Sequence, residues 1–205
     1  MKNKNSSMTR IILITGGQRS GKSSEAERMA LSLSPRPVYM ATAHAWDDEF
    51  RERIRRHQER RGPQWTNIEE ERHLSRHDLS GRVVVVDCVT LWLTNLLFAA
   101  TMGNTGSATA TSAPDCAASA ANAPDCAASG INIDHTLKTA QEEFDRLTAQ
   151  DATFIFVTNE IGSGGVSDNA LQRQFTDLEG WMNQYIARRA DEVILMVSGI
   201  AVKIK

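Results

Sequence analysis

Residues 10–23 read RIILITGGQRSGKS, a short apolar run that leads into a glycine-rich loop. The loop fits the pattern G-x-x-x-x-G-K-[ST], and it lies between a predicted strand and a predicted helix, as that motif requires. Backbone amides and a helix N-terminus would face a phosphate, Lys22 could reach the β- and γ-phosphates, and Ser23 could hold Mg²⁺. We therefore expect a nucleotide to contact Gly16, Gly17, Gln18, Arg19, Ser20, Gly21, Lys22 and Ser23.

Outward from this loop, short β-branched runs alternate with helix-like stretches along the whole chain. The pattern predicts strands at Arg10–Thr15, Val38–Ala41, Val83–Asp87, Phe154–Thr158 and Val193–Ser198, with Ala201–Ile204 as a candidate sixth. It predicts helices at Lys22–Leu33, Asp47–Arg61, Val89–Ala99, Asp134–Gln150 and Asn169–Arg189. Strands that are apolar on both faces and alternate with helices indicate a mostly parallel α/β sheet covered on both sides. We expect one P-loop NTPase-like domain over residues 10–205.

Composition narrows the functional class. The 205 residues carry 23 basic and 25 acidic side chains, a net charge of -2, which argues against a dedicated nucleic-acid binder. The amino terminus has no signal-peptide core, and no apolar run is long enough to span a bilayer. Three cysteines without CxxC spacing indicate neither a disulfide framework nor a zinc site, and Cys88 reads as a small buried side chain. We expect a cytoplasmic protein without stable membrane insertion.

Two segments lie outside the α/β pattern. Residues 1–9 are polar and read as a flexible tail, in which Met8 is an alternative start. Residues 101–133 form the second segment, in which residues 103–130 contain no large apolar side chain and APDCAAS occurs at 113–119 and again at 123–129. This composition predicts a flexible insertion between two helices, although a paired-cysteine device is an alternative.

A carboxylate follows the run of valines at 83–86. P-loop enzymes use an acid at the end of a neighbouring strand to hold Mg²⁺ or its waters. Asp87 stands at that position, where ligands of open α/β sheets bind. Asp87 and Ser23 are therefore the predicted metal ligands. Capping of the helix that follows is an alternative role for Asp87, and the two roles are compatible.

Residues 47–61 read DDEFRERIRRHQERR and form a predicted helix with an acidic start and a basic end, which suits the helix dipole. His57 continues the apolar stripe of Phe50 and Ile54, among six arginines. Those charges would lower the pKa of His57 and keep its imidazole neutral, the form that attacks phosphorus. The same pattern also suits a solvated, salt-bridged face. On residue type alone, His44 is an equal candidate for a catalytic histidine.

Taken together, six blocks of the sequence resemble a known family. They are GGQRSGKS at 16–23, YMATA at 39–43, DDEFRERI at 47–54 with His57, VDCVTLWLTNLL at 86–97, VTNEIG at 157–162 and VSGI at 197–200. In this order they resemble the bifunctional adenosylcobinamide kinase/adenosylcobinamide-phosphate guanylyltransferases of cobalamin synthesis. The likeness covers about residues 10–98 and 134–205.

The resemblance implies two successive reactions. ATP or GTP phosphorylates the aminopropanol hydroxyl of adenosylcobinamide. GTP then gives GMP to a histidine, which falls on His57, and adenosylcobinamide phosphate displaces it to form adenosylcobinamide-GDP. The positions that match GTP contacts of the family are Thr42, Ala43, His44, Gln58, Glu59, Arg60, Arg61, Glu69 and Asp87. The resemblance also implies Mg²⁺ and a homo-oligomer such as a trimer.

Two alternatives stay open at this point. A P-loop kinase of small molecules would use the same loop without guanylyl transfer, and it would form no covalent nucleotide. A nucleotide-binding regulator would bind triphosphates without turning over any cobinamide.

Overall fold

The computed structural model describes residues 9–43, 55, 61–103 and 132–205. Its strands form one seven-stranded sheet in the order β3-β2-β4-β5-β1-β6-β7, which is parallel except for the antiparallel pair of β6 and β7. The strands are β1 (Arg10–Gly16), β2 (Val38–Ala41), β3 (Thr66–Glu69), β4 (Val83–Asp87), β5 (Thr153–Val157), β6 (Glu192–Val197) and β7 (Ile200–Lys203). The α-helices are α1 (Lys22–Leu33), α3 (Val89–Gly103), α4 (Ile133–Thr148) and α5 (Ala170–Arg189).

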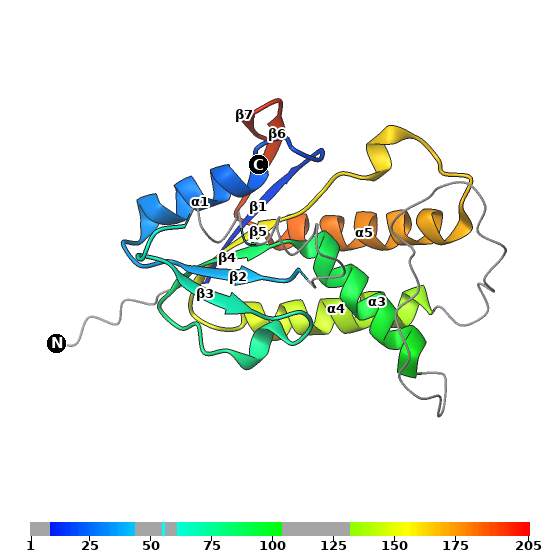
Figure 1. Cartoon of the computed structure of the whole chain (residues 1–205), viewed down its shortest axis with the longest axis horizontal. Coiled ribbons are helices and arrows are strands. Elements are labelled where there is room, and N and C mark those ends of the chain that lie inside the picture. The colour runs from blue at the N-terminus through cyan, green and yellow to red at the C-terminus, as the bar shows by residue number, and fades with distance from the viewer. Residues whose placement is uncertain (1–8, 44–54, 56–60, 104–131) are drawn as a thin grey trace.

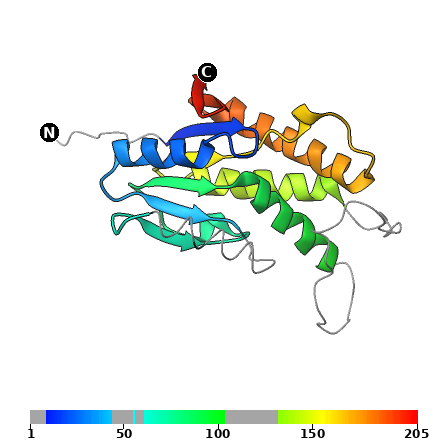
Figure 2. The ribbon, with the colours of Figure 1, turned by 45° about the horizontal axis from the view of Figure 1, so that its top comes forward.

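Helices cover both faces of this sheet, as predicted, and the alternation of side chains along β1 shows how. Ile12 and Ile14 point to the face where α1 packs with Ala26 and Ala30. Ile11 and Leu13 point to the opposite face, which α3, α4 and α5 cover. Figures 1 and 2 show α1 on one side of the sheet and α4 and α5 on the other. A buried parallel sheet needs apolar residues at successive positions for this reason.

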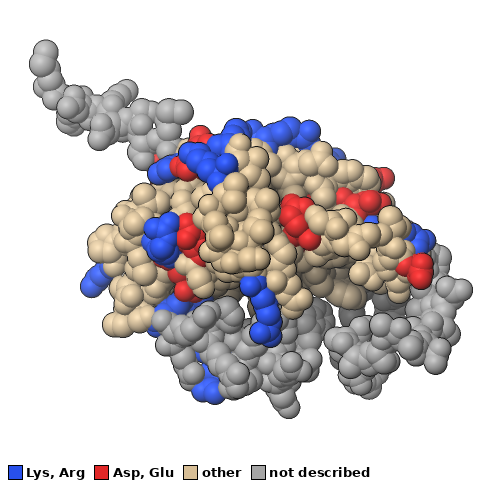
Figure 3. Space-filling model, turned by 90° about the horizontal axis from the view of Figure 1, so that it is seen from above, with Lys and Arg blue, Asp and Glu red and all other residues tan. Residues whose placement is uncertain are grey.

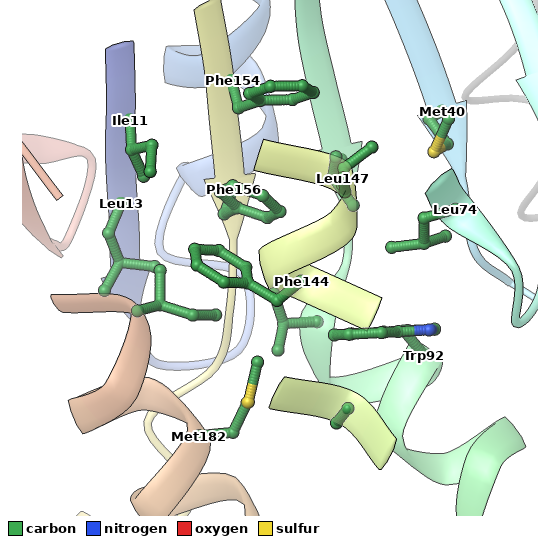
Figure 4. Close-up of a cluster of buried hydrophobic side chains, with 14 of the residues drawn as sticks. Ile11, Leu13, Met40, Leu74, Trp92, Phe144, Leu147, Phe154, Phe156 and Met182 are labelled. Atoms are coloured by element: carbon green, nitrogen blue, oxygen red, sulfur yellow. The ribbon is translucent and has the colours of Figure 1, made fainter. Parts of the chain in front are cut away.

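The larger of the two cores lies between the sheet and the helices α3, α4 and α5. Phe144 of α4 is fully buried against Phe156 of β5, with ring centroids 5.1 Å apart. Trp92 of α3 and Met182 of α5 are also fully buried in this cluster (Figure 4). Burying an aromatic or large aliphatic side chain contributes roughly 1.5–3 kcal/mol, so this cluster fixes where the helices sit over the strands.

Apart from shifts of one or two residues at the ends of several elements, the predicted elements differ from the observed ones in two ways, and part of the prediction lies outside the described residues. β3 was not predicted, because its sequence TNIE is polar and every one of its residues is exposed or half-buried at the sheet edge. α3 continues to Gly103, four residues beyond its predicted end, into the predicted insertion. Almost all of the predicted helix at 47–61, the tail and residues 104–131 of the insertion lie outside the described residues.

The described residues include no helix long and apolar enough to cross a membrane. Figure 3 shows acidic and basic side chains in separate small groups over the face seen from above, without one continuous basic surface. Cys88 is buried, as expected, and burial raises the pKa of its thiol to about 12. That thiol is therefore unreactive at neutral pH.

Candidate active site

The register of the sheet brings the predicted site residues to one edge. Glu69 pairs with Ala41, Ala41 with Asp87, and Asp87 with Val157, which in turn pairs with Ile14. All five lie at or near the carboxyl ends of parallel strands, which in Figure 1 point the same way. The loops that follow these strands therefore share one edge of the sheet, where ligands of open α/β sheets bind.

The glycine-rich loop begins immediately after β1, and its two end glycines are needed for different reasons. Gly16 has a φ of 149°, and a Cβ there would lie 2.5 Å from the Met196 carbonyl oxygen of β6. Gly21 has a φ of 98°, which side chains rarely adopt, and it directly precedes α1. A Cβ on Gly17 would have no neighbour within 4 Å, so packing does not require a glycine there, and the contact that the fold makes with Gly17 is through its carbonyl oxygen, which accepts from Lys22.

The N-terminus of α1 adjoins this loop and is suited to bind an anion. Gly21 provides no side-chain cap, and the backbone amides of the first turn are helix donors without intrahelical partners. Such an end attracts phosphate through both its amides and the helix dipole. Ser23 lies in this first turn and is half-buried.

Lys22 is held inside the loop. It is 7% exposed, and its Nζ donates to the Gly17 carbonyl oxygen at 2.6 Å. Burial lowers the pKa of Lys22, and the charges of Asp87 and Glu179 act in the opposite direction. The Lys22 side chain is thus kept next to the loop, where its Nζ can exchange the Gly17 carbonyl oxygen for the oxygens of a bound phosphate.

Asp87 is fixed by a chain of contacts that reaches across the neighbouring strands. Its carboxylate accepts a hydrogen bond from the Tyr39 hydroxyl of β2. The Arg61 guanidinium lies over the Tyr39 ring, 3.6 Å from its centroid, and Arg61 Nε donates to Asn67 Oδ1 at 3.0 Å. Burial, helped by Asp87, raises the pKa of Tyr39 well above its ordinary value. Tyr39 therefore stays a hydrogen-bond donor to Asp87.

One nitrogen of the Arg61 guanidinium is available as a hydrogen-bond donor to a ligand. The residue is 9% exposed, and its Nη1 has no hydrogen-bond partner among the residues described. Buried guanidinium nitrogens are almost always paired, because an unpaired one is costly. Arg61 is therefore suited to an anionic ligand at the β2 and β3 side of the edge.

Thr42 lies at this edge, where its hydrogen bonds connect neighbouring strands. Its side chain is fully buried, and its Oγ1 both donates to the Cys88 carbonyl oxygen and accepts from the Cys88 amide, each at 2.8 Å. Asn95 Nδ2 of α3 donates to the Thr42 carbonyl oxygen at 2.7 Å. These bonds tie the ends of β2 and β4 together, so Thr42 fixes the spacing of the site.

A second polar network lies behind the loop, where α3, β5 and α5 meet. Thr90 donates to Glu179 Oε1 and accepts from both nitrogens of Asn159, at 3.1 Å and 3.0 Å. Asn183 Nδ2 donates to the Asn159 carbonyl oxygen at 3.0 Å and its Oδ1 accepts from Thr158 at 2.7 Å. All of these bonds except the one between Thr90 and Glu179 involve Thr158 or Asn159, the first residues after β5.

Glu179 is the most perturbed acid of this network. It is 1% exposed, and its Oε2 has no hydrogen-bond partner in the described part of the chain. Burial raises the pKa of Glu179 to about 7; the Thr90 hydroxyl opposes this shift, the Glu160 charge adds to it, and Lys22 also opposes it. A buried acid with such a pKa beside the P-loop lysine is a feature typical of functional sites.

The donor set at this edge suits Mg²⁺. Ser23 offers a hydroxyl in the first turn of α1, after β1, and Asp87 offers a carboxylate at the end of β4; both are hard oxygen ligands. No cluster of three or more acidic, histidine or cysteine residues that could hold a metal occurs among the described residues. Mg²⁺ keeps waters and substrate phosphates as ligands and is usually bound through only one or two protein carboxylates.

The predicted site residues thus divide into two groups. The structure places the P-loop residues 16–23, Thr42, Ala43, Asp87, Arg61 and Glu69 along one edge of the sheet. His44, His57, Gln58, Glu59 and Arg60 lie outside the described residues.

Sequence reasoning gave no role to Tyr39, Glu160 or Glu179. A signal for Glu179 exists, since Glu179 and Asn183 are polar residues four apart that lie directly beside the apolar stripe of Leu178, Met182 and Ile186 on the helix.

The chain is similar to known proteins over most of its length. Residues 12–204 match the family model described as cobinamide kinase / cobinamide phosphate guanyltransferase. The bifunctional adenosylcobalamin biosynthesis protein CobU of Salmonella typhimurium is 38% identical over 95% of this chain and 99% of its own. The protein of the same name from Escherichia coli is 36% identical with the same coverage. CobP of Pseudomonas aeruginosa is 34% identical over 94% of this chain and 96% of its own.

Proposed function

Because the chain belongs to the cobinamide kinase / cobinamide phosphate guanyltransferase family, we propose that it carries out both reactions through the sheet edge described above. A nucleoside triphosphate phosphorylates the hydroxyl of adenosylcobinamide. GTP then donates GMP to adenosylcobinamide phosphate, which gives adenosylcobinamide-GDP and diphosphate. The observation that carries the proposal is the P-loop, with Lys22 buried in it, on the same edge as Asp87 and Arg61.

In the first reaction, the protein binds and orients the triphosphate. The open N-terminus of α1 and the loop amides receive the phosphates, and Lys22 moves from the Gly17 carbonyl to phosphate oxygens. Ser23 and Asp87 would hold Mg²⁺, which neutralises phosphate charge when bound. Tyr39 holds Asp87 through a hydrogen bond, so the carboxylate keeps one orientation toward the ligand. Positioning of this kind supplies most of the catalysis in phosphoryl transfer.

In the second reaction, we propose that His57 is the nucleophile. Its neutral imidazole attacks the α-phosphorus of GTP, a P–N bond forms and diphosphate leaves. An oxygen of adenosylcobinamide phosphate then attacks the same phosphorus, and the P–N bond breaks. His57 lies outside the described residues, so its role rests on the Arg-rich motif and on the family.

The sheet separates two places where phosphates can bind. β1, which carries the P-loop, and β2, which leads to Thr42, are three strands apart, about 14 Å at the usual spacing between strands. Arg61, whose Nη1 has no hydrogen-bond partner within the described ranges, lies on the β2 side. We propose that this side takes the GTP whose GMP is transferred, with Arg61 neutralising phosphate charge.

A homo-oligomer in the cytoplasm remains part of the proposal. The last strand of the sheet, β7, lies on the side away from β3. The β6–β7 hairpin and the residues after it expose four apolar side chains, Val197, Ile200, Val202 and Ile204. Exposed apolar edge strands favour pairing with another chain. Light scattering of the purified protein tests this, and a monomer at micromolar concentration would contradict it.

GTP labelled in its α-phosphate tests the covalent step and separates the alternatives. The wild-type protein should retain acid-labile, base-stable label after denaturation, and His57→Ala should retain none. His135→Ala is a matched control, because His135 is an exposed histidine of α4, and it should label like the wild type. An unlabelled wild type would support a simple kinase. Loss of label in His44→Ala with retention in His57→Ala would transfer the nucleophilic role to His44.

A further inference from the structure

The segment that follows β5 contains a carboxylate to which the two reactions above assign no role. β5 lies between β1, which carries the P-loop, and β4, which ends in Asp87. Glu160 follows β5 by three residues. Its position in the sheet order therefore places it between the bound triphosphate and the predicted metal ligand.

The backbone and side chain of Glu160 are both held against the P-loop strand. The Glu160 amide donates to the Gly16 carbonyl oxygen at 3.1 Å, and Glu160 Oε1 accepts from the Thr15 hydroxyl at 2.9 Å. The preceding Asn159 is fixed by Thr90 and by Asn183, as described above. These hydrogen bonds fix the segment after β5, and with it the position of the Glu160 carboxylate.

The other carboxylates of the edge do not match this placement. Asp87 already accepts from Tyr39 and is the predicted metal ligand. Glu179 is 1% exposed and cannot meet a substrate in this arrangement. Glu69 ends β3, four strands from β1, or about 19 Å away. Glu160 is exposed, so a bulky acceptor can reach it.

We propose that Glu160 is the general base of the phosphoryl-transfer step, an inference that rests on the proposed kinase function. Its carboxylate takes the proton of the substrate hydroxyl as that oxygen bonds to the γ-phosphorus. The bond between the γ-phosphorus and the bridging oxygen breaks, and the nucleoside diphosphate leaves with that electron pair. Glu160 later returns its proton to solvent. Thr15, which donates to Oε1, is the positioning residue for this carboxylate.

Two substitutions at Glu160 and one control test the proposal. Glu160→Gln keeps the size and the acceptor for Thr15 but cannot take a proton, whereas Glu160→Asp can take one from a longer distance. Glu142→Gln removes an exposed carboxylate of α4 and serves as the control. Each variant is assayed for phosphorylation of adenosylcobinamide, for nucleotide binding, and for guanylyl transfer to adenosylcobinamide phosphate supplied ready-made.

We expect Glu160→Gln to lower kcat for phosphorylation by about 10²- to 10⁴-fold, the usual contribution of a general base. Nucleotide Kd and guanylyl transfer should stay within about threefold of wild type, and Glu160→Asp should recover part of the rate. The fall of the wild-type kcat at acid pH should be absent in Glu160→Gln. Glu142→Gln should behave like the wild type in every assay.

Three other results would overturn the inference. Phosphorylation by Glu160→Gln within threefold of wild type would show that no base is needed at this position. A raised Mg²⁺ requirement with an unchanged pH profile would assign Glu160 to the metal instead. A wild type that binds nucleotide but never phosphorylates adenosylcobinamide would overturn the kinase function itself, and this inference with it.

Discussion

Glu179 offers a quantitative test of the polar network behind the P-loop. Its carboxyl is buried between α3, β5 and α5, and its pKa is raised to about 7 from an ordinary 4.5, chiefly by burial. Lys22 attracts the charged form and Glu160 repels it. The perturbation is Glu179→Gln, which removes the charge but keeps an oxygen that can accept from Thr90.

The sign of the effect follows from proton linkage. The folded chain binds the Glu179 proton more tightly than the unfolded chain does, so this contribution to stability is complete below pH 4.5 and is lost as the pH rises to about 7. At 1.36 kcal/mol for each pKa unit, the loss amounts to about 3 kcal/mol. Glutamine undergoes no such loss. The free energy of unfolding of Glu179→Gln should therefore rise relative to wild type by about 3 kcal/mol between pH 4.5 and pH 8.

Urea unfolding followed by tryptophan fluorescence at several pH values measures this difference. Glu142→Gln, an exposed acid on α4, should show no comparable trend. Other carboxyls titrate in both proteins, so they largely cancel when wild type and variant are compared. A difference between wild type and Glu179→Gln that stays constant from pH 4.5 to pH 8, or that shrinks, would refute the reasoning.

Three further substitutions test the loop and the core. Lys22→Ala should weaken triphosphate binding at least tenfold and abolish phosphorylation, because charge-assisted bonds to phosphate contribute about 1.5–3 kcal/mol each; unchanged binding in a titration would contradict this. Gly16→Ala should lower both stability, by more than about 1 kcal/mol, and nucleotide affinity, because its Cβ would lie 2.5 Å from the Met196 carbonyl oxygen; wild-type values in both assays would refute the clash. Phe144→Ala should cost about 3–5 kcal/mol in urea unfolding, since the ring is fully buried, and a loss below 1 kcal/mol would show that the core collapses around it.

The sequence predicted those elements that carry strong local signals. β2, β4 and α1 have the predicted bounds, because apolar β-branched runs and the P-loop mark their ends. β3 could not be predicted in this way, since an exposed edge strand needs no apolar face. The order of strands in the sheet was also beyond the sequence pattern, because it depends on which runs pair in space.

The same distinction holds for the site. The motif identified Lys22 and the valine run identified Asp87, since both chemistries follow from local sequence. The Tyr39 contact with Asp87 joins residues 48 positions apart, and the Thr90 contact with Glu179 spans 89. Only the fold brings such residues together, so their roles emerge from the structure.

The products formed by His57→Ala test the central claim, that one chain performs two separable reactions. The variant is incubated with adenosylcobinamide, ATP, GTP and Mg²⁺, and the corrinoids are identified by mass spectrometry. Phosphoryl transfer needs the P-loop but no histidine intermediate. The variant should therefore accumulate adenosylcobinamide phosphate without adenosylcobinamide-GDP, whereas the wild type forms the GDP product. Formation of adenosylcobinamide-GDP by His57→Ala at the wild-type rate would contradict the account.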